Sequence, residues 1–447
     1  MFAVKRGEVK ERLDVTYNDP KISAIIGKIA KISIPFGKMI ESISGGATPL
    51  RANDSQYSDE GINFLRIQNV TPFGIDLNDV KHIVLEIHNG LLLRSQLATD
   101  DLLMTITGRI GTCSVVTEDV LPANINQHIV RIRLKSELLP EFVACYLNSD
   151  IGQKFSNRGV TGTTRIALDY ESIKRIPVPL IDKQEQRRLV EFMNVAACSR
   201  SEKLREADAL LSGMSDFVCE ALKISLTTEI PKLGVGVTIR QLKADKAFNV
   251  EYYHAERTNT IAAVKAVPHK RLGDCVYFIR DIVSVNDGQY LGLAGVQSNT
   301  GELSGAEDEA TGQAFVFQVN DVLYCRLRPY LNKVWKAEYG GVCSTEFHVL
   351  RVKCNGILPE YLATVMRSTL VLNQSRHMMT GNTHPRITND DVANLLIPMP
   401  DILIQQKIAD EMKIRRDNAR ALRTEAETEW AVAKVQFERE LLGGTGK

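Results

Sequence analysis

The sequence predicts an α+β protein with an internal pseudo-two-fold repeat. In this fold, two mixed, mostly β globular domains are joined by two long antiparallel coiled-coil helices. Three observations predict it: a heptad-spaced stretch in the middle of the chain, a second one at its end, and a series of short matches between the two halves. The expected boundaries are residues 1–181 for the first globular domain, 182–224 for the central helix, 225–236 for a linker, 237–400 for the second globular domain and 401–447 for the last helix.

The stretch from Asp182 to Leu222 has the spacing of one long helix. Apolar residues recur there at alternating steps of three and four, without proline and with a single glycine, Gly213. Such a heptad seam needs a helical partner along its length. The seam positions are Val190, Met193, Ala197, Arg200, Leu204, Ala207, Leu211, Met214, Val218 and Ala221.

The last part of the chain supplies that partner. The same rhythm runs through Ile408, Met412, Arg415, Ala419, Leu422, Ala426, Ala433 and Phe437, with a slip around Glu429 and Trp430. Each seam carries one arginine, whose side chain we expect simply to reach solvent along the helix. A helix of about forty residues is roughly 60 Å long, and antiparallel packing would relate the two halves by a pseudo-two-fold axis.

The two halves match in one order along the chain. The matching pairs are 13–17 with 248–252, 64–70 with 290–296, 101–104 with 321–324, 128–132 with 348–352, 139–142 with 358–361, 161–164 with 380–383, and 176–179 with 397–400. With the long helices, these make eight correspondences. They indicate two copies of one unit, each a globular domain followed by a helix.

The local patterns predict the elements of one unit. Runs at 101–107 and 113–117 flank the turn Gly108–Gly111 and predict a hairpin, and 126–134 alternates as a further strand. Residues 140–148 have helical spacing, which 358–367 repeats. Residues 176–179 and 397–400 share the pattern Ile-Pro-x-Pro. They cannot form a central strand or the interior of a helix, because proline lacks an N–H donor.

The composition bounds the function. The chain is 44% hydrophobic and 24% charged with a formal net charge of +1, so binding of a polyanion must depend on local patches. The eight cysteines include no CxxC pair, which fits buried thiols in a reducing compartment. Without a signal-peptide pattern or a run that could span a bilayer, we expect a cytoplasmic protein.

Catalytic and metal-binding motifs are missing from the sequence. It contains no [DN]PP[YF] run, no GxxxxGK[ST] loop and no zinc-type set of histidines and cysteines, and Gly234-Val235-Gly236 is a lone GxG in the expected linker. The sequence therefore predicts a protein that binds rather than catalyses, with no catalytic residues, no metal ligands and no cofactor in this chain.

Polar, basic loops at matched positions are the candidate DNA-binding sites. Arginine, lysine, asparagine and threonine are the residue types that read base edges or hold phosphates. A single such loop is explained well enough by ordinary turn composition, but recurrence at one repeat position with different residues favours two readers of two different sequences. The candidates are Thr48, Arg51, Arg66, Asn69, Arg109, Thr163 and Arg165 in the first domain, and Arg326, Arg328, Tyr330, Lys333, Asn382, His384 and Arg386 in the second.

Several of these segments resemble the specificity subunit of type I restriction-modification systems. The resemblance covers nearly the whole chain and is carried by 45–49, 64–70, 101–116, 176–179 followed by Glu185-Gln186, 326–333, 343–347 and 383–387. The second half departs from the pattern, since it lacks the Gly-Gly-x-x-Pro loop and has no glutamate before Gln405.

The resemblance implies a non-catalytic subunit with two target recognition domains, each reading one half of a bipartite site in double-stranded DNA. The helices would set the gap and dock two modification subunits, which carry the adenine-N6 methyltransferase chemistry and bind S-adenosylmethionine. Restriction subunits, where present, would use ATP and Mg²⁺. Two other classes stay open: a coiled-coil scaffold with two peptide-binding domains, and a standalone DNA nuclease or methyltransferase with unrecognised motifs.

Overall fold

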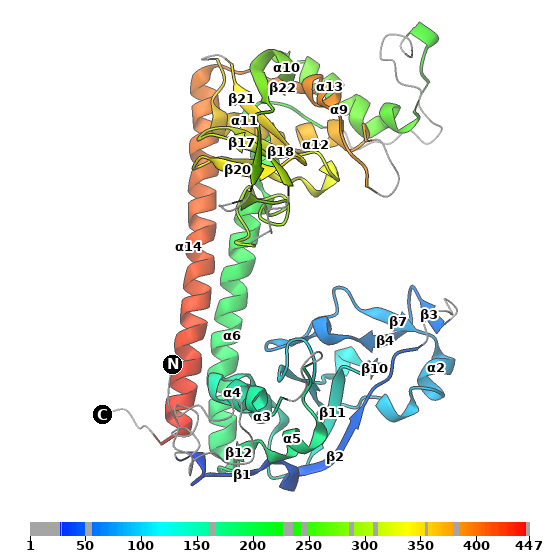
Figure 1. Ribbon diagram of the computed structural model, residues 1–447, viewed down its shortest axis with the longest axis vertical. Helices are drawn as coiled ribbons and strands as arrows, with labels where there is room; N and C mark the ends of the chain where they lie inside the picture. Colours follow the sequence, from blue (N-terminus) through cyan, green and yellow to red (C-terminus); the bar gives the residue numbers. More distant parts are fainter. Residues whose placement is uncertain are drawn as a thin grey trace. The chain divides into compact units, whose positions relative to one another are not determined.

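The computed structural model describes residues 27, 29–49, 56–160, 166–226, 236–240, 242, 249–285, 290–306, 312–353, 356–379 and 384–443. The chain divides into two compact units: residues up to 202 together with those from 426 onward, and residues 203–425. Each unit combines a globular domain with parts of the two long helices, so the predicted fold class is confirmed (Figure 1). The repeat segment 13–17, the loops 161–164 and 380–383 and most of the expected linker lie outside the described residues.

One four-stranded antiparallel sheet is present in both units. Its strand order in the first unit is β2 (Ile40–Gly45), β11 (Ile129–Leu134), β8 (Leu102–Thr105) and β9 (Cys113–Val115). Its order in the second unit is β14 (Val276–Ile279), β21 (Phe347–Val352), β18 (Val322–Cys325) and β19 (Val334–Lys336). Strand by strand these occupy matching positions of the repeat, and the expected hairpin and the strand that follows it are both confirmed.

The other sheet is only half repeated. In the first unit it runs β10 (Ala123–Ile125), β4 (Ile62–Leu65), β7 (Lys81–Ile83) and β3 (Tyr57–Ser58), and in the second β15 (Ile282–Val285), β17 (Gly312–Phe317), β20 (Gly341–Ser344) and β16 (Tyr290–Leu291). Each contains one parallel pair, β10 with β4 and β20 with β16. In the first unit the remaining strands, β7 and β3, are added on the β4 side of this pair. In the second unit the remaining strands, β17 and β15, are added on the β20 side. The globular domains therefore share one sheet and diverge in the other.

Short helices and a proline-bounded strand pair complete each unit. The helices are α2 (Leu85–Asn89), α3 (Pro140–Asn148), α4 (Asp150–Arg158) and α5 (Tyr170–Arg175) in the first unit, and α9 (Ala255–Lys265), α10 (Leu272–Cys275), α11 (Pro359–Arg367), α12 (Thr369–Ser375) and α13 (Asn389–Ala393) in the second. The Ile-Pro-x-Pro segments form two-stranded ladders, β1 (Ser33–Pro35) with β12 (Pro177–Pro179) and β13 (His269–Arg271) with β22 (Leu396–Pro398). Such ladders tolerate proline, as expected.

A buried glutamine repeats at the start of each long helix. Gln186 accepts a hydrogen bond from the backbone N–H of Leu139 at 2.8 Å and donates two to backbone carbonyls. Gln405 makes the same three bonds, starting with the N–H of Leu358 at 3.0 Å. The glutamate missing before Gln405 therefore leaves this joint unchanged.

The expected central helix is divided in two, which corrects the prediction of a single helix. It consists of α6 (Lys183–Ser212) and α7 (Met214–Ala221), separated at Gly213 with φ −76° and ψ 5°. Glycine has a low helix propensity, and its carbonyl accepts a hydrogen bond from Arg415 Nη1 at 3.3 Å. The last helix, α14 (Ile402–Leu441), is continuous over 40 residues. Over the described ranges, no helix has both the length and the apolar composition to cross a membrane.

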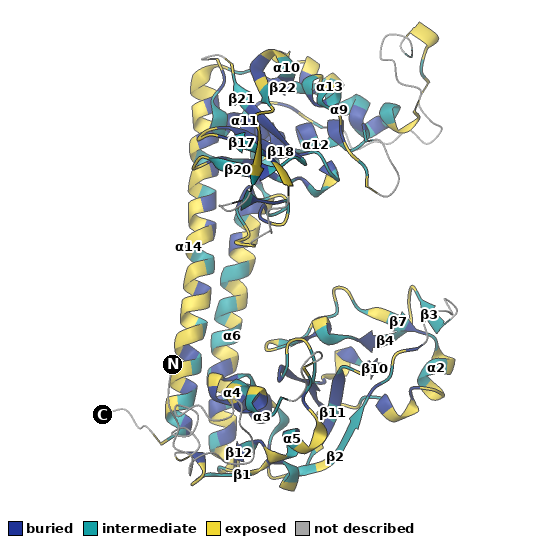
Figure 2. Cartoon of the chain, viewed as in Figure 1, coloured by how far each residue is buried: buried dark blue, intermediate teal, exposed yellow. Residues whose placement is uncertain are grey.

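The two long helices pair antiparallel within each unit. Ion pairs join rising positions on α6 to falling positions on α14: Arg188 with Glu440 and Arg200 with Glu427 in the first unit, and Lys203 with Glu425 and Asp208 with Arg423 in the second. Many seam residues are buried, such as Met193 and Phe437 in the first unit, and the others are half-buried. Figure 2 shows buried and half-buried residues along both helices. The heptad prediction is therefore confirmed.

The seam arginines do more than reach solvent. The Arg200 guanidinium lies 4.1 Å from the centre of the Phe73 ring, and that ring packs against Trp430 with centroids 4.9 Å apart. Phe73 lies at the tip of the hairpin formed by β5 (Val70–Thr71) and β6 (Gly74–Ile75). At Trp430, where the heptad spacing is interrupted, a hairpin of the globular domain thus packs against α14. Arg415 lies over Phe217 in the second unit, at 5.0 Å.

Candidate nucleic-acid interface

A polar groove of about 900 Å³ opens in the first unit beside the divergent sheet. Its walls come from the chain after β2, from β3, β4 and β7, and from the loop between β10 and β11. Two predicted residues, Thr48 and Arg66, line it. The other lining residues were not among the predicted sites: Tyr57, Ser58, Asp59, Phe64, Lys81, Asn126, Gln127 and His128.

A chain of hydrogen bonds ties three loops together at this groove. Thr48 Oγ1 donates to Gln127 Oε1, Gln127 Nε2 lies 3.1 Å from His128 Nε2, and His128 Nδ1 lies 2.9 Å from Thr107 Oγ1. The loop after β2 is thereby joined to the hairpin turn that carries Arg109. Arg109 itself is exposed, next to Gly108 with φ +67°. Two separate predicted loops therefore meet in one place.

Arg66 is held at the groove by an exposed acidic partner. Its Nη2 donates to the Asp79 carbonyl at 2.6 Å and to the Asp79 carboxylate at 3.1 Å, and the Asp79 side chain is 77% exposed. An ion pair this open to water contributes about 1 kcal/mol at most. A phosphate could therefore compete for Arg66, with Lys81 on the same groove as a second cation.

Asn69 does not face the groove, which corrects its prediction as a DNA contact. The residue is 1% exposed, its Oδ1 accepts from the Arg66 N–H at 2.9 Å, and its Nδ2 donates to the Asp76 carbonyl at 2.8 Å. Its polar groups are used within the protein, so it positions Arg66.

Gly46 also has a structural rather than a phosphate-binding role. A Cβ at this position would overlap the carbonyl oxygen of Ile125. The glycine therefore lets the loop pack against β10, and its backbone is covered by protein.

In the second unit, two predicted loops lie side by side. The Arg328 N–H donates to the Pro385 carbonyl at 2.7 Å, and the Ile387 N–H donates to the Arg326 carbonyl at 3.1 Å. Tyr330 and His384 are exposed here, and Arg328 is half-buried with a left-handed backbone, φ 51°. The structure thus brings the loop after β18 against the late loop, a contact that the sequence did not predict.

Three other predicted cations are engaged within the protein. Arg386 forms a two-pronged ion pair with Glu346 (Nη2–Oε1 2.6 Å, Nε–Oε2 3.0 Å), a hydrogen-bonded contact that raises the pKa of Arg386. Arg326 Nη1 donates to the Thr345 carbonyl at 3.3 Å, and Lys333 Nζ donates to the Leu293 carbonyl at 2.6 Å. These side chains therefore stabilise the loops through contacts within the protein, and their polar groups are engaged there rather than directed at a ligand.

A neutral histidine lies beneath these loops. His348 is 3% exposed, and its burial, with further contributions from Arg326 and Arg280, lowers its pKa from about 6.5 to about 3. Its ring stacks near Tyr324, with centroids 6.2 Å apart. His348 therefore packs beneath the two loops as an uncharged side chain.

Four predicted site residues, Arg51, Thr163, Arg165 and Asn382, lie outside the described residues. Of the groove residues that the sequence analysis missed, His128 carried a signal, because it opens one of the repeat segments. Lys81 and Tyr57 carried none, since only the pairing of β7 with β3 and β4 brings them to the groove.

Comparison with known proteins identifies the class. Residues 50–202 match the family described as "Type I restriction modification DNA specificity domain". The matched range contains most of the groove residues of the first unit. The predicted resemblance to type I specificity subunits is therefore confirmed, and the residues that match this family's model lie in the first unit.

Three particular proteins illustrate the similarity. The chain is 27% identical over 202 residues to the type I restriction enzyme EcoBI specificity subunit of Escherichia coli, over 42% of each chain. It is 26% identical over 117 residues to the EcoDI specificity subunit of the same organism, over 25% of this chain and 26% of that one. The aligned parts thus span less than half of either relative. A crystal structure of the S subunit from M. genitalium aligns over 92% of this chain and 95% of its own, with a TM-score of 0.40 and 13% identity.

Proposed function

We propose that this chain is the DNA-reading subunit of a type I restriction-modification complex and recognises a bipartite site. The main support is that residues 50–202, which match the DNA specificity domain family, contain the polar groove except for its lining residue Thr48. The repeat supplies a second globular domain with the same first sheet and a divergent second one. Each unit therefore reads a different half of the site.

Side chains on the groove and on the neighbouring hairpin turn suggest how the first half is read. Arginine can bind guanine through two hydrogen bonds and glutamine can do so with adenine, which suits the exposed Arg109 and Gln127. We expect Arg66 and Lys81, which line the groove, to hold phosphates. In the second unit, Arg328, Tyr330 and His384 take the corresponding role.

The helices would set the gap between the half-sites and dock two modification subunits. Exposed apolar side chains on both helices of the first unit support docking: Val195 is 62%, Val432 60% and Val435 61% exposed. The chain itself would be non-catalytic and act in the cytoplasm, where its DNA target lies. S-adenosylmethionine would bind the modification subunits, and ATP with Mg²⁺ would bind restriction subunits where these are present.

The test is adenine-methylation mapping of DNA from cells that carry this chain with its modification subunit. We expect one split motif, two short specific blocks around a fixed gap. The Arg109→Ala variant should relax one block only, at a cost of about 1–3 kcal/mol for a base contact. Arg94→Ala, an exposed arginine away from the groove, is the matched control and should leave both blocks intact.

Other results would point elsewhere. Equal loss on all sequences would make Arg109 a phosphate contact. Methylation or cleavage by the purified chain alone would establish an enzyme. Failure to bind duplex DNA, although the complex forms, would favour a coiled-coil scaffold for peptides.

A further inference from the structure

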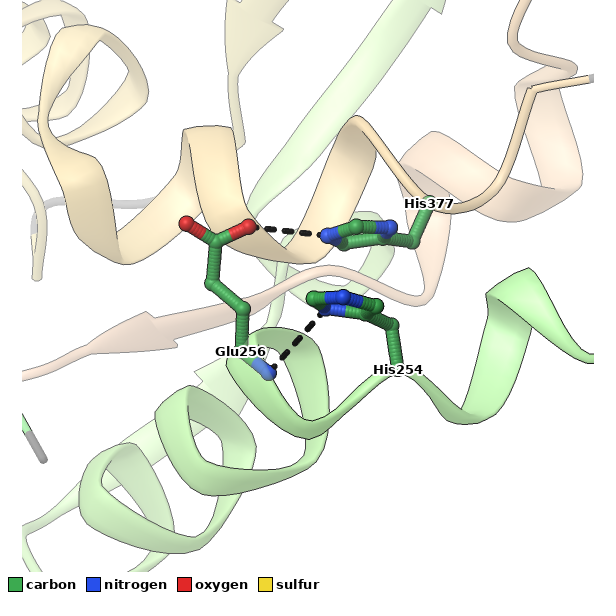
Figure 3. Close-up of side chains that lie close together, drawn as sticks. All are labelled: His254, Glu256 and His377. Carbon is green, nitrogen blue, oxygen red and sulfur yellow. Dashed lines mark hydrogen bonds and ion pairs between the residues drawn. The ribbon is translucent and has the colours of Figure 1, made fainter. Parts of the chain in front are cut away.

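Two imidazoles and a carboxylate converge in the second unit, between the start of α9 and the end of α12. His254 caps the N-terminus of α9, Glu256 lies in the first turn of that helix, and His377 follows the end of α12 (Figure 3). One ligand atom from each residue lies within 4.8 Å of the other two, and all three residues are half-buried. No motif predicts this cluster, because 121 residues separate Glu256 from His377.

The contacts already point the side chains at one another. His377 Nε2 lies 2.8 Å from Glu256 Oε2, and the two histidine rings stack with centroids 4.1 Å apart and planes at 14°. The His254 Nδ1 accepts from the Glu256 N–H at a long 3.3 Å. The ligand atoms are therefore close together, and the stacked rings must tilt toward each other to direct their lone pairs at one point.

A second carboxylate holds the other side of His377. Its Nδ1 lies 3.2 Å from Glu251 Oε2. Histidines that bind metals almost always donate their other ring N–H to a carboxylate or carbonyl, which fixes the ring and raises the basicity of the binding nitrogen. Glu251 takes that position independently of the three converging groups.

The charges also favour a cation. Glu251 and Glu256 bring two negative charges, and Arg376, whose Nη1 lies 3.3 Å from Glu256 Oε1, brings one positive charge. With neutral imidazoles the cluster carries a net charge of −1. A dication at His377 Nε2 would displace any proton there to solvent, since metal-binding imidazole nitrogens are unprotonated.

We propose that His254, Glu256 and His377 bind a transition-metal dication of the Zn²⁺ type, with Glu251 as the hydrogen-bonded support of His377. Imidazole nitrogens with one carboxylate oxygen are a ligand set that suits Zn²⁺. The ion would tie the start of α9 to the end of α12, two helices that already pack together. This site is independent of the proposed DNA-reading function.

The test is a calorimetric titration of Zn²⁺ into the full chain. The exposed thiol of Cys198 is another zinc ligand, so all proteins carry Cys198→Ser. We expect one Zn²⁺ bound per chain, with an increase in Tm, and no binding of Mg²⁺. His377→Ala and the shape-conserving Glu256→Gln should lose this binding event, and Glu251→Gln should weaken it by about 10–100-fold.

His269→Ala is the matched control, because this exposed histidine of the same unit lies on β13, outside the cluster. It should bind Zn²⁺ like the parent protein. Unchanged Zn²⁺ affinity in the well-folded Glu256→Gln and His377→Ala variants would overturn the proposal. So would a parent protein that takes up no Zn²⁺ at millimolar concentration, in which case the stacked histidines are only a helix-packing contact.

Discussion

At the scale of single residues, the candidate interface separates side chains that face outward from those that hold them. Arg66 lies on the groove, whereas Asn69, three residues later, is buried beneath it. The residue types and the loops were predictable from the sequence. The direction of each side chain was not, because it depends on a 3-10 turn at Ile67–Asn69 and on the partner Asp76.

His348 gives a pH-dependent stability. In the unfolded chain its pKa is near 6.5, whereas in the folded protein it is about 3. Between these values the unfolded state binds more protons, so the free energy of unfolding falls as the pH falls. From pH 7.0 to 5.5 this residue should cost about 1 kcal/mol.

Urea unfolding followed by tryptophan fluorescence in a Trp430→Phe background, which leaves the buried Trp335 of the same unit as the reporter, measures this effect. The His348→Gln variant should lose less stability between the two pH values than the parent, and the exposed-residue control His269→Gln should behave like the parent. Equal losses in the parent and in His348→Gln would contradict a neutral buried His348.

Arg328 combines backbone strain with a predicted DNA contact. A non-glycine residue at φ 51° has a conformational cost of about 1 kcal/mol. We expect Arg328→Gly to raise the free energy of unfolding by up to about 1 kcal/mol while relaxing recognition of one half-site.

Chemical denaturation and methylation mapping together test Arg328. Asn320→Gly, at another left-handed position (φ 70°) away from the loops, should leave the DNA readout unchanged. A stabilised Arg328→Gly variant with full specificity would remove Arg328 from the interface.

At the scale of elements, the periodic features were predictable and the irregular ones were not. Heptad spacing predicted the helix pair, and alternation predicted the hairpin of β8 and β9. The break falls at Gly213, whose low helix propensity is a local signal that does not by itself determine a break, and the Gly213 carbonyl accepts a hydrogen bond from Arg415. The opposite extensions of the second sheets depend on strand pairing between distant segments and have no local signature.

The hairpin of β5 and β6 fixes the globular domain to the helices of the first unit. Phe73→Ala removes the ring contact with Trp430 and the stack under Arg200, and we expect a loss of about 1–2 kcal/mol. Trp430 should become more exposed, with red-shifted emission and faster hydrogen exchange in the last turns of α14.

Leu91→Ala is the control, since Leu91 is another large apolar side chain of the same unit and is 58% exposed. Trp430 emission that is identical in the parent and in Phe73→Ala would show that the hairpin does not hold the helix.

At the scale of the whole molecule, the proposed gap between half-sites depends on helix length. Removing one heptad from α6 and the paired heptad from α14 preserves the seam and shortens each helix by about 10 Å. That length corresponds to about three base-pair steps. The methylated motif should keep both blocks with a gap about three base pairs shorter.

Deletion from one helix alone is the control, because it breaks the pairing register and should abolish methylation. An unchanged gap in the doubly shortened protein would show that the helices do not determine the spacing.

The first unit is built from segments that are distant in the chain, and this affects its folding during translation. Phe437 and Leu441 share a hydrophobic core with Phe142 and Leu189, and Glu438 accepts a hydrogen bond from the N–H of Ile151 at 2.7 Å. During translation, the C-terminal part of the first unit, from residue 426 onward, is synthesised more than 200 residues after residue 202. The second unit is continuous and can close earlier, so the half that is synthesised first is completed last. Until then, its nascent core is open to chaperones or to a neighbouring chain.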